Sequence, residues 1–206
     1  MIAIMDYGVG NLFSVEKAFL YLGADAKITS DAEVLRRAEK IVLPGVGAFG
    51  DCMKNLQASG MVPVLTEQIK AGVPLLGICV GLQILFEGSD ESPEETGLGF
   101  LRGRVKKIQA DGLKIPHMGW NSLHVERRAP VDLFAGLSAD PFVYFVHSYH
   151  AVPEEAGVVT ATADYGERLT AAVAKDNICA TQFHPEKSGD VGLKIIKNFI
   201  DGGDAA

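Results

Sequence analysis

Cysteine is scarce in this sequence and is not arranged in pairs. The chain of 206 residues has three cysteines, at positions 52, 79 and 179, and their spacing makes neither a disulfide framework nor a paired metal motif. A disulfide-stapled, secreted fold is therefore not expected, and a reducing compartment fits the sequence best.

Positive charge and long apolar runs are lacking as well. The 19 Lys and Arg residues are outnumbered by 26 Asp and Glu residues, which gives a net charge of −7, whereas a nucleic-acid-binding protein needs a basic face. No apolar run is long enough to cross a bilayer, and the N-terminal MIAIMDYGVGN has neither the basic start nor the cleavage site of a signal peptide. We expect a cytoplasmic protein with no nucleic-acid partner and no contact with a membrane.

The composition that remains suits one domain, over residues 1–206, because 48% of the residues are hydrophobic and 22% are charged. In the first half, strand-like runs alternate with helical patterns, which predicts an α/β fold with a mostly parallel, wound sheet and helices on both faces. Ser14 is expected to cap the first helix. Strands are expected at 2–7, 26–29, 40–45 and 74–79, and helices at 15–23, from Asp31, at 50–60, 63–72 and 80–87.

The second half has closely spaced strand-like pieces, which predicts an antiparallel β extension of the sheet. An amphipathic helix is expected at GDVGLKIIKNFI near the end, and the acidic EGSDESPEETG at 87–97 is expected to be a surface loop. The strand-like pieces are GRVKKIQ, NSLHVE, FVYFVHSYHAV, GVVTATADY, LTAAVA and ICATQFHPE.

Cys79 stands between two glycines at the point where an apolar run stops, in PLLGICVGLQ. The G-x-C-x-G spacing has the form of the nucleophile elbow, a tight strand-to-helix turn, with sulfur in place of the hydroxyl. Gly77 and Gly81 would remove side chains that collide in such a turn, and a helix N-terminus beneath the sulfur favours the thiolate. The alternative is a small buried cysteine that packs as a hydrophobe.

A cysteine nucleophile needs a base, and the base needs a group that orients it. Pro185 favours extended backbone at His184 in TQFHPEKSG, and side chains two apart in an extended chain lie on one face. Glu186 could then accept a hydrogen bond from one imidazole nitrogen while the other nitrogen faces Cys79. An HPE tripeptide alone is more often a strand exit, but together with an elbow cysteine it indicates a Cys–His–Glu triad.

These two motifs, GICVGLQ and QFHPEKS, resemble those of the class I, triad-type glutamine amidotransferases. Within that family, the blocks DYGVGN, LPGVGAFG, PHMGWN and YFVHSYH are similar to those of the glutaminase subunits of imidazole glycerol phosphate synthase. The resemblance runs from the first strand to the last helix. It implies a glutaminase with Cys79, His184 and Glu186 as its triad, with no cofactor and no metal.

The resemblance also implies where glutamine binds. One oxyanion donor is expected from the N–H of Val80, which the elbow geometry places, and the second from the PGVG segment, at Val46 and Gly47. By resemblance this second donor is the Val46 N–H, and the strand is expected to need a peptide flip to present it. The sequence departs here from most class I amidotransferases, which carry a further glycine at the position of Pro44. The residues that would contact substrate are Gln83, Glu91, His147, Ser148 and Tyr149.

A partner is implied too, namely the cyclase subunit of imidazole glycerol phosphate synthase, with which the chain would form a heterodimer and to which the ammonia would pass. The expected interface residues are Asn11, Met118, Trp120 and Lys187, of which Trp120 suits an interface anchor. Cys52 and Cys179 are expected to be structural thiols. The histidines at 117, 124 and 150 have no metal-ligand spacing.

Other interpretations of the residues remain open at this point. The PGVG segment could be a glycine-rich loop or a weak phosphate cradle, although it lacks the Lys-Ser/Thr of a P-loop. The chain could be the glutaminase subunit of another synthase, such as that of the pyridoxal phosphate pathway. It could also be a cysteine peptidase or a non-catalytic binding module of similar fold.

Overall fold

The computed structural model describes residues 1–126 and 131–202. Its central sheet has the strand order β2-β1-β3-β4-β13-β12-β11-β8. Strands β2 to β13 in that order are parallel, and the remaining three continue the same sheet in antiparallel fashion. The bounds are β1 Ile2–Met5, β2 Ala26–Thr29, β3 Lys40–Gly45, β4 Leu75–Cys79, β8 His124–Val125, β11 Val159–Tyr165, β12 Glu167–Lys175 and β13 Ile178–Thr181.

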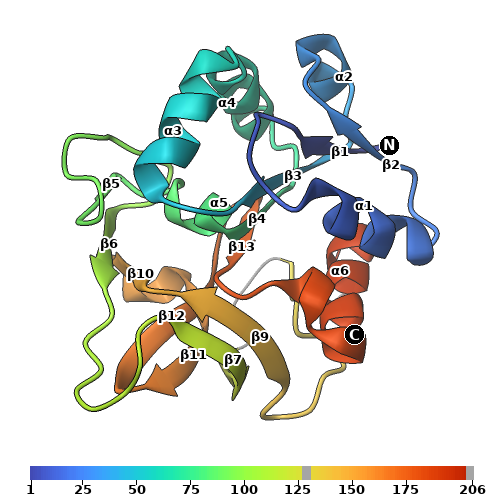
Figure 1. Cartoon of the computed structure of the whole chain (residues 1–206). Helices are drawn as coiled ribbons and strands as arrows, with labels where there is room; N and C mark the ends of the chain where they lie inside the picture. Colours follow the sequence, from blue (N-terminus) through green and yellow to red (C-terminus); the bar gives the residue numbers. More distant parts are fainter. Residues whose placement is uncertain (127–130, 203–206) are drawn as a thin grey trace.

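Helices cover both faces of the parallel part of the sheet, as the alternation of patterns predicts. Figure 1 shows α2, α3 and α4 together on one side, and α1 beside α6 on the other. The strands between these two layers are almost wholly apolar, because a strand covered on both faces has no polar side. The helices are α1 Leu12–Tyr21, α2 Ala32–Arg36, α3 Phe49–Ala58, α4 Val62–Lys70, α5 Val80–Gln83 and α6 Gly189–Asp201, with 3₁₀ turns η1 Ala156–Val158 and η2 Pro185–Lys187.

Two small sheets lie beside the antiparallel end of the central sheet (Figure 1). One has the order β10-β6-β5 and the other pairs β7 with β9. The end of β9 and the start of β10, one strand from each small sheet, form one wall of a cavity at the carboxyl end of β4. Their strands are β5 Gly88–Ser89, β6 Gly103–Lys107, β7 His117–Ser122, β9 Phe142–His147 and β10 Tyr149–Pro153. In the described parts of the chain, no helix is both long enough and apolar enough to cross a membrane.

The predicted fold class is therefore confirmed, while several element predictions are wrong. Ser14 does not cap α1, because the helix begins at Leu12 and Asn11 occupies the N-cap without a side-chain bond. The segment FVYFVHSYHAV is not one strand, since it breaks at Ser148 into β9 and β10, which belong to different sheets. NSLHVE likewise divides at Leu123 between β7 and β8.

The helix expected at 80–87 is a single turn, Val80–Gln83. It ends early because the returning chain takes its backbone carbonyls: the N–H groups of Leu98 and Leu101 donate to Ile84 and Leu85. Nor is the acidic stretch 87–97 wholly a surface loop, because it contains β5 and because Ser89 is fully buried.

Glycines make the turn after β4 possible, as the sequence predicts. A Cβ atom on Gly81 would lie 1.9 Å from the carbonyl oxygen of Leu43, and one on Gly77 would lie 2.9 Å from the carbonyl oxygen of Gly81. Both obstacles are backbone atoms, which cannot swing aside as a side chain would.

We expect Gly81→Ala to destabilise the protein. Helix propensity alone would favour alanine by about 1 kcal/mol, but the clash with β3 opposes it, and overpacking of this kind costs about 1–3 kcal/mol or more. Denaturant unfolding should report a lower free energy of unfolding. Gly157→Ala is the matched control, because nothing lies within 4 Å of a Cβ there, and it should change stability by less than about 0.5 kcal/mol. Equal stability of the two variants would contradict this account of the turn.

Candidate active site

Cys79 is the last residue of β4 and the residue before α5. Its backbone has φ 57° and ψ −112°, a conformation that is costly for a residue with a Cβ and that persists only where the surroundings enforce it. The thiol is 4% exposed. This geometry is the nucleophile elbow that the glycine spacing predicts, and it turns the sulfur toward the carboxyl edge of the sheet.

His184 and Glu186 come together by a different route from the one predicted. The strand β13 ends at Thr181, and Glu186 lies in the 3₁₀ turn η2, not in extended chain. Pro185 opens that turn, which folds the carboxylate back so that its Oε1 is 2.8 Å from His184 Nδ1. His184 Nε2 is then the nitrogen that faces the Cys79 thiol, with which the imidazole interacts.

The imidazole of His184 is buried between two partners that can carry negative charge. Burial by itself lowers the pKa of His184, but hydrogen bonds and charge interactions with Cys79 and Glu186 outweigh it and raise the pKa to about 9. An imidazolium in contact with the sulfur stabilises the thiolate, which is the reactive form. Glu186 Oε2 is buried and has no hydrogen-bond partner among the described residues, so His184 supplies the compensation for this carboxylate.

Gln182 belongs to the site although sequence analysis did not single it out. Its side chain is fully buried, and its Nε2 lies 3.8 Å from Cys79 Sγ as a weak donor. Its Oε1 accepts a hydrogen bond of 3.0 Å from Gln83 Nε2. The signal was available, because Gln182 stands two residues before His184 within the QFHPEKS motif.

A cavity of about 400 Å³ opens above the thiol, and most of the expected site residues line it. They come from the PGVG segment, the elbow, the acidic stretch, the bend between β9 and β10, and η2. The residues in the lining are Val46, Gly47, Cys79, Val80, Gln83, Glu91, Pro116, Val146, His147, Ser148, Tyr149, His184 and Lys187. Chain segments far apart in the sequence therefore converge on one pocket of the size that a small molecule requires.

Two of the expected substrate contacts already have protein partners. Both amide hydrogens of Gln83 are used, by the carbonyl of Tyr149 at 3.1 Å and by Gln182, which leaves its Oε1 as the atom for a ligand. Glu91 Oε2 accepts a bond of 2.8 Å from the N–H of Phe49, the first residue of α3. Gln83 thus fixes the backbone of Tyr149 in the cavity wall through a hydrogen bond, and Glu91 fixes the first residue of α3 in the same way.

The histidines at 117 and 147 form a pair behind this wall. His147 Nδ1 donates to the carbonyl of Tyr149 at 2.9 Å, so its Nε2 carries the lone pair and accepts from His117 Nδ1, also at 2.9 Å. Burial lowers the pKa of His147 to about 3 and that of His117 to about 4. Both rings are neutral at ordinary pH, so the direction of these bonds is fixed and the Tyr149 backbone is held in place.

The PGVG segment runs alongside the elbow. Gly45 pairs with Cys79 at the end of β3, and a Cβ on Gly45 would lie 2.6 Å from the backbone nitrogen of Gly81. Val46 follows, 38% exposed, and Gly47 has φ +88°. Val46, Gly47 and Val80 all line the cavity, and their part in an oxyanion hole stays a prediction.

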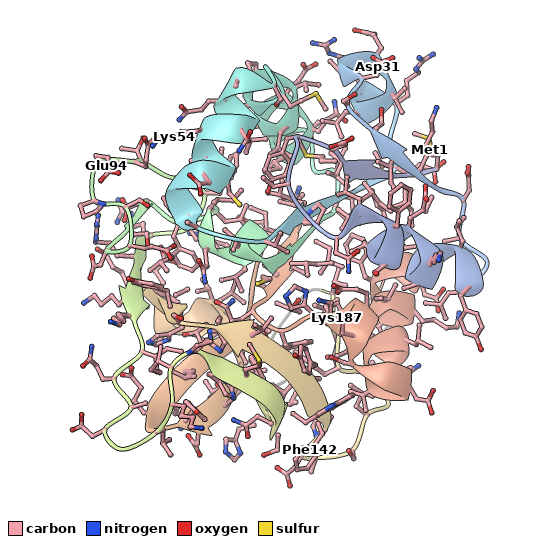
Figure 2. The ribbon with its side chains drawn as sticks, viewed as in Figure 1. Met1, Asp31, Lys54, Glu94, Phe142 and Lys187 are labelled. Atoms are coloured by element: carbon pink, nitrogen blue, oxygen red, sulfur yellow. The ribbon has the colours of Figure 1, made fainter. Side chains whose placement is uncertain are left out.

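The four expected interface residues are exposed. Met118 and Trp120 are 61% and 56% exposed on one face of β7, and Trp120 packs edge-on against Tyr144 of β9, with ring centroids 6.2 Å apart. Asn11 precedes α1. Lys187 lies at the rim of the cavity, and Figure 2 shows it near the centre of the view, between β9 and α6.

Among the residues that the structure describes, no group of three or more His, Cys, Asp or Glu side chains could hold a metal ion. The site places a cysteine beside a buried imidazole whose pKa is raised, which is an arrangement that can activate a thiol as a nucleophile.

We expect Cys79→Ala to lower the pKa of His184 from about 9, because the burial that lowers this pKa would remain while the sulfur that raises it would be lost. The pKa can be followed by NMR of the imidazole nitrogens over pH 5–10. Cys179→Ala is the control, since that thiol is buried elsewhere, on β13, and it should leave the titration unchanged. An unaltered His184 pKa in Cys79→Ala would mean that the two side chains do not interact.

Comparisons with known proteins agree with this geometry. Residues 3–202 match the profile of the family described as Glutamine amidotransferase class-I. A protein of Syntrophotalea carbinolica named Imidazole glycerol phosphate synthase subunit HisH is 53% identical, over 98% of this chain and the whole of the relative. The protein of the same name from Geobacter metallireducens is 52% identical, over 96% of each chain.

A solved structure titled "Crystal structure of glutamine amidotransferase" superimposes with a TM-score of 0.77, at 22% identity and over 98% of each chain. At that sequence identity, the similarity to this structure supports the fold assignment alone. The family profile and the half-identical relatives go further, because they cover nearly every residue of the chain. On these grounds the chain belongs to the class I glutamine amidotransferases and, among them, to the HisH subunits of imidazole glycerol phosphate synthase.

Proposed function

We propose that this chain hydrolyses glutamine to glutamate and ammonia with Cys79, His184 and Glu186 as its catalytic triad, and that it delivers the ammonia to a cyclase subunit. That subunit would make imidazole glycerol phosphate and an aminoimidazole carboxamide ribonucleotide in histidine biosynthesis. The observation that carries the proposal is the meeting of an elbow cysteine with a buried His–Glu pair in one cavity. The cytoplasm is the compartment that suits a free reactive thiol.

The acylation step follows from the charges at the site. The Cys79 thiolate attacks the side-chain carbonyl carbon of glutamine, and the oxygen becomes an oxyanion. The C–N bond then breaks, and the imidazolium of His184 gives its proton to the leaving nitrogen, which departs as ammonia. Glu186 Oε1 holds Nδ1 throughout, at 2.8 Å, so that Nε2 remains aimed at the sulfur and the leaving group.

Deacylation reverses these roles. Neutral His184 takes a proton from a water molecule, whose oxygen attacks the thioester carbon, and the Cys79 thiolate leaves. The product leaves as glutamate after its new carboxyl group gives its proton to solvent, and the thiolate–imidazolium pair is restored. The proposed cycle involves no change of oxidation state, and His184 carries its proton transfers, so it calls on no cofactor.

Glutamine would lie along the wall described above. The backbone of His147, Ser148 and Tyr149 would bind its carboxylate, and the remaining oxygen of Gln83 and the free oxygen of Glu91 would accept from its ammonium group. The His117–His147 pair supports this assignment, because neutral rings fix the Tyr149 backbone without adding positive charge to the pocket. The oxyanion would bind to the N–H groups of Val80 and Val46, with Gly47 allowing the close approach.

The cyclase partner would dock on the face that carries Asn11, Met118, Trp120 and Lys187. Large exposed side chains favour this face, since a half-exposed tryptophan beside a methionine suits an interface. Lys187 lies at the cavity rim and is thus both a cavity residue and a candidate interface residue. The half-identical relatives named as subunits of imidazole glycerol phosphate synthase favour this synthase over the pyridoxal phosphate pathway, a cysteine peptidase or a binding module.

The triad can be tested in the complex with the cyclase subunit of the same organism. Cys79→Ala should abolish glutaminase activity, and His184→Ala should lose nearly all of it, while Glu186→Gln should lose less because an orienting residue contributes less than the base. A glutamine-analogue electrophile should label Cys79 and neither Cys52 nor Cys179. Circular dichroism must accompany His184→Ala, since that change leaves a buried carboxylate unpaired. Labelling of another cysteine, or normal turnover in folded His184→Ala, would refute the triad.

We also expect the partner to control turnover. Val46 is β-branched, and the peptide that precedes it would have to turn for its N–H to reach the oxyanion, at a conformational cost. A site with one donor missing loses about 2.7–4 kcal/mol of transition-state stabilisation, on the order of a hundred- to a thousandfold in rate. Cyclase with its ribonucleotide ligand should therefore raise kcat far more than it lowers KM.

Val46→Gly should raise the basal kcat of the isolated subunit, because glycine turns more easily. Steady-state glutamate release, with and without the partner, measures both quantities. If the isolated wild-type subunit already turns over at the rate of the ligand-bound complex, then the oxyanion hole is preformed and the partner does not control it.

A further inference from the structure

Two buried polar side chains lie beneath the PGVG segment and take no part in the proposed reaction. Tyr7 follows β1 and is 4% exposed, and Cys52 lies in the first turns of α3 and is fully buried. Tyr7 lies in the DYGVGN block, where it was assigned no role, and Cys52 was expected to be a structural thiol. Both side chains form hydrogen bonds in addition to packing against their neighbours.

Each side chain donates to one backbone carbonyl of the segment. Tyr7 Oη donates to the carbonyl of Pro44 at 2.6 Å, and Cys52 Sγ donates to the carbonyl of Val46 at 3.3 Å. The phenol and the thiol also interact with each other. One cluster thus holds the chain on both sides of Gly45.

The two hydrogen bonds lie on either side of a single peptide unit of the backbone. The Pro44 carbonyl belongs to the peptide unit before the Gly45–Val46 peptide, and the Val46 carbonyl belongs to the unit after it. The Gly45–Val46 peptide carries the N–H that would serve the oxyanion. A peptide flip changes mainly ψ of one residue and φ of the next while the flanking units stay in place, so anchors in these two units confine the movement to one peptide.

Both donors keep their hydrogens at neutral pH. Burial and the neighbouring Cys52 raise the pKa of Tyr7 well above its ordinary value of 10, and burial raises the pKa of Cys52 to about 11. Gly45 completes the arrangement, because a Cβ there would meet the Gly81 nitrogen at 2.6 Å and Tyr7 Oη at 3.1 Å. The PGVG segment therefore lies between the Tyr7 and Cys52 side chains and the turn that carries Cys79.

We propose that Tyr7 and Cys52 are positioning residues for the glutaminase reaction, which fix the units on either side of the Gly45–Val46 peptide so that its N–H is aimed at the oxyanion when the peptide turns. This inference rests on the proposed function. Neither side chain touches the substrate. They act through the backbone of the segment, so they should affect stabilisation of the transition state and not the binding of glutamine.

The test compares kcat and KM of the complex with saturating cyclase and its ribonucleotide ligand. Tyr7→Phe and Cys52→Ala each remove one anchor and keep most of the packing. We expect each to lower the stimulated kcat about ten- to a hundredfold, as a misplaced oxyanion donor does, with KM for glutamine within about twofold of wild type. Cys52→Ser keeps a donor and should recover part of the lost kcat.

Cys179→Ala is the matched control for Cys52→Ala. Both changes remove a buried thiol, but Cys179 lies on β13, and its sulfur is 4.0 Å from the Val131 carbonyl oxygen, outside the PGVG segment. The control should lower the melting temperature as Cys52→Ala does and leave kcat unchanged. The double variant Tyr7→Phe/Cys52→Ala should lose less than the product of the single losses, because both anchors serve one segment.

The outcomes separate this inference from the function on which it rests. Stimulated kcat within twofold of wild type in Tyr7→Phe and Cys52→Ala, with melting temperatures lowered as in Cys179→Ala, would show that both side chains only pack, and would overturn the inference alone. A raised KM with unchanged kcat would overturn it as well. If wild-type protein in the complex does not hydrolyse glutamine at all, then the proposed function fails, and the inference fails with it.

Discussion

The backbone of the turn after β4 approaches the end of β3 so closely that no side chain fits between them, and the site is built around this contact. Gly81 faces the Leu43 carbonyl and Gly45 faces the Gly81 nitrogen. Their proximity forces Cys79 into its strained conformation and thereby aims the thiol. It also sets the PGVG segment beside Cys79. The conformation of Cys79 and the position of the PGVG segment are thus consequences of one steric constraint.

The charge state of His184 does not follow from this steric constraint and depends on the electrostatic surroundings of the ring. His184 is buried, and burial alone would make it neutral, yet Cys79 and Glu186 together raise its pKa to about 9. The pair of histidines at 117 and 147 is buried too, but lacks an acidic partner in its bonds and is neutral. In the proposed reaction the same residue type would therefore serve as a proton donor at one side of the cavity and as a rigid support at the other.

Local patterns were sufficient to predict the parallel half of the fold and most of the residues that the structure brings together around the cavity. Glycine spacing predicted the turn at Cys79, and the HPE motif predicted the His184–Glu186 pair. The backbone conformation predicted for that pair was wrong, because Pro185 starts a 3₁₀ turn instead of prolonging a strand. The break at Ser148 was missed since both halves of FVYFVHSYHAV have strand-like residues, and only their pairing with different strands separates them. Tyr7 and Cys52 were missed for a related reason: their carbonyl partners are 37 and 6 residues away.

The backbone of Tyr144 has a mechanical consequence for the whole assembly. Its carbonyl accepts from the His184 N–H at 3.0 Å, and its N–H donates to Ser188 Oγ at 3.0 Å, so that two hydrogen bonds join β9 to the segment that carries His184. Tyr144 also pairs with Trp120 in the two-stranded sheet. A displacement of that sheet would be transmitted to His184 through these hydrogen bonds. The proposed flip, by contrast, would move only the Gly45–Val46 peptide on the other side of the cavity, so that turnover would be switched without disturbing His184 and Glu186.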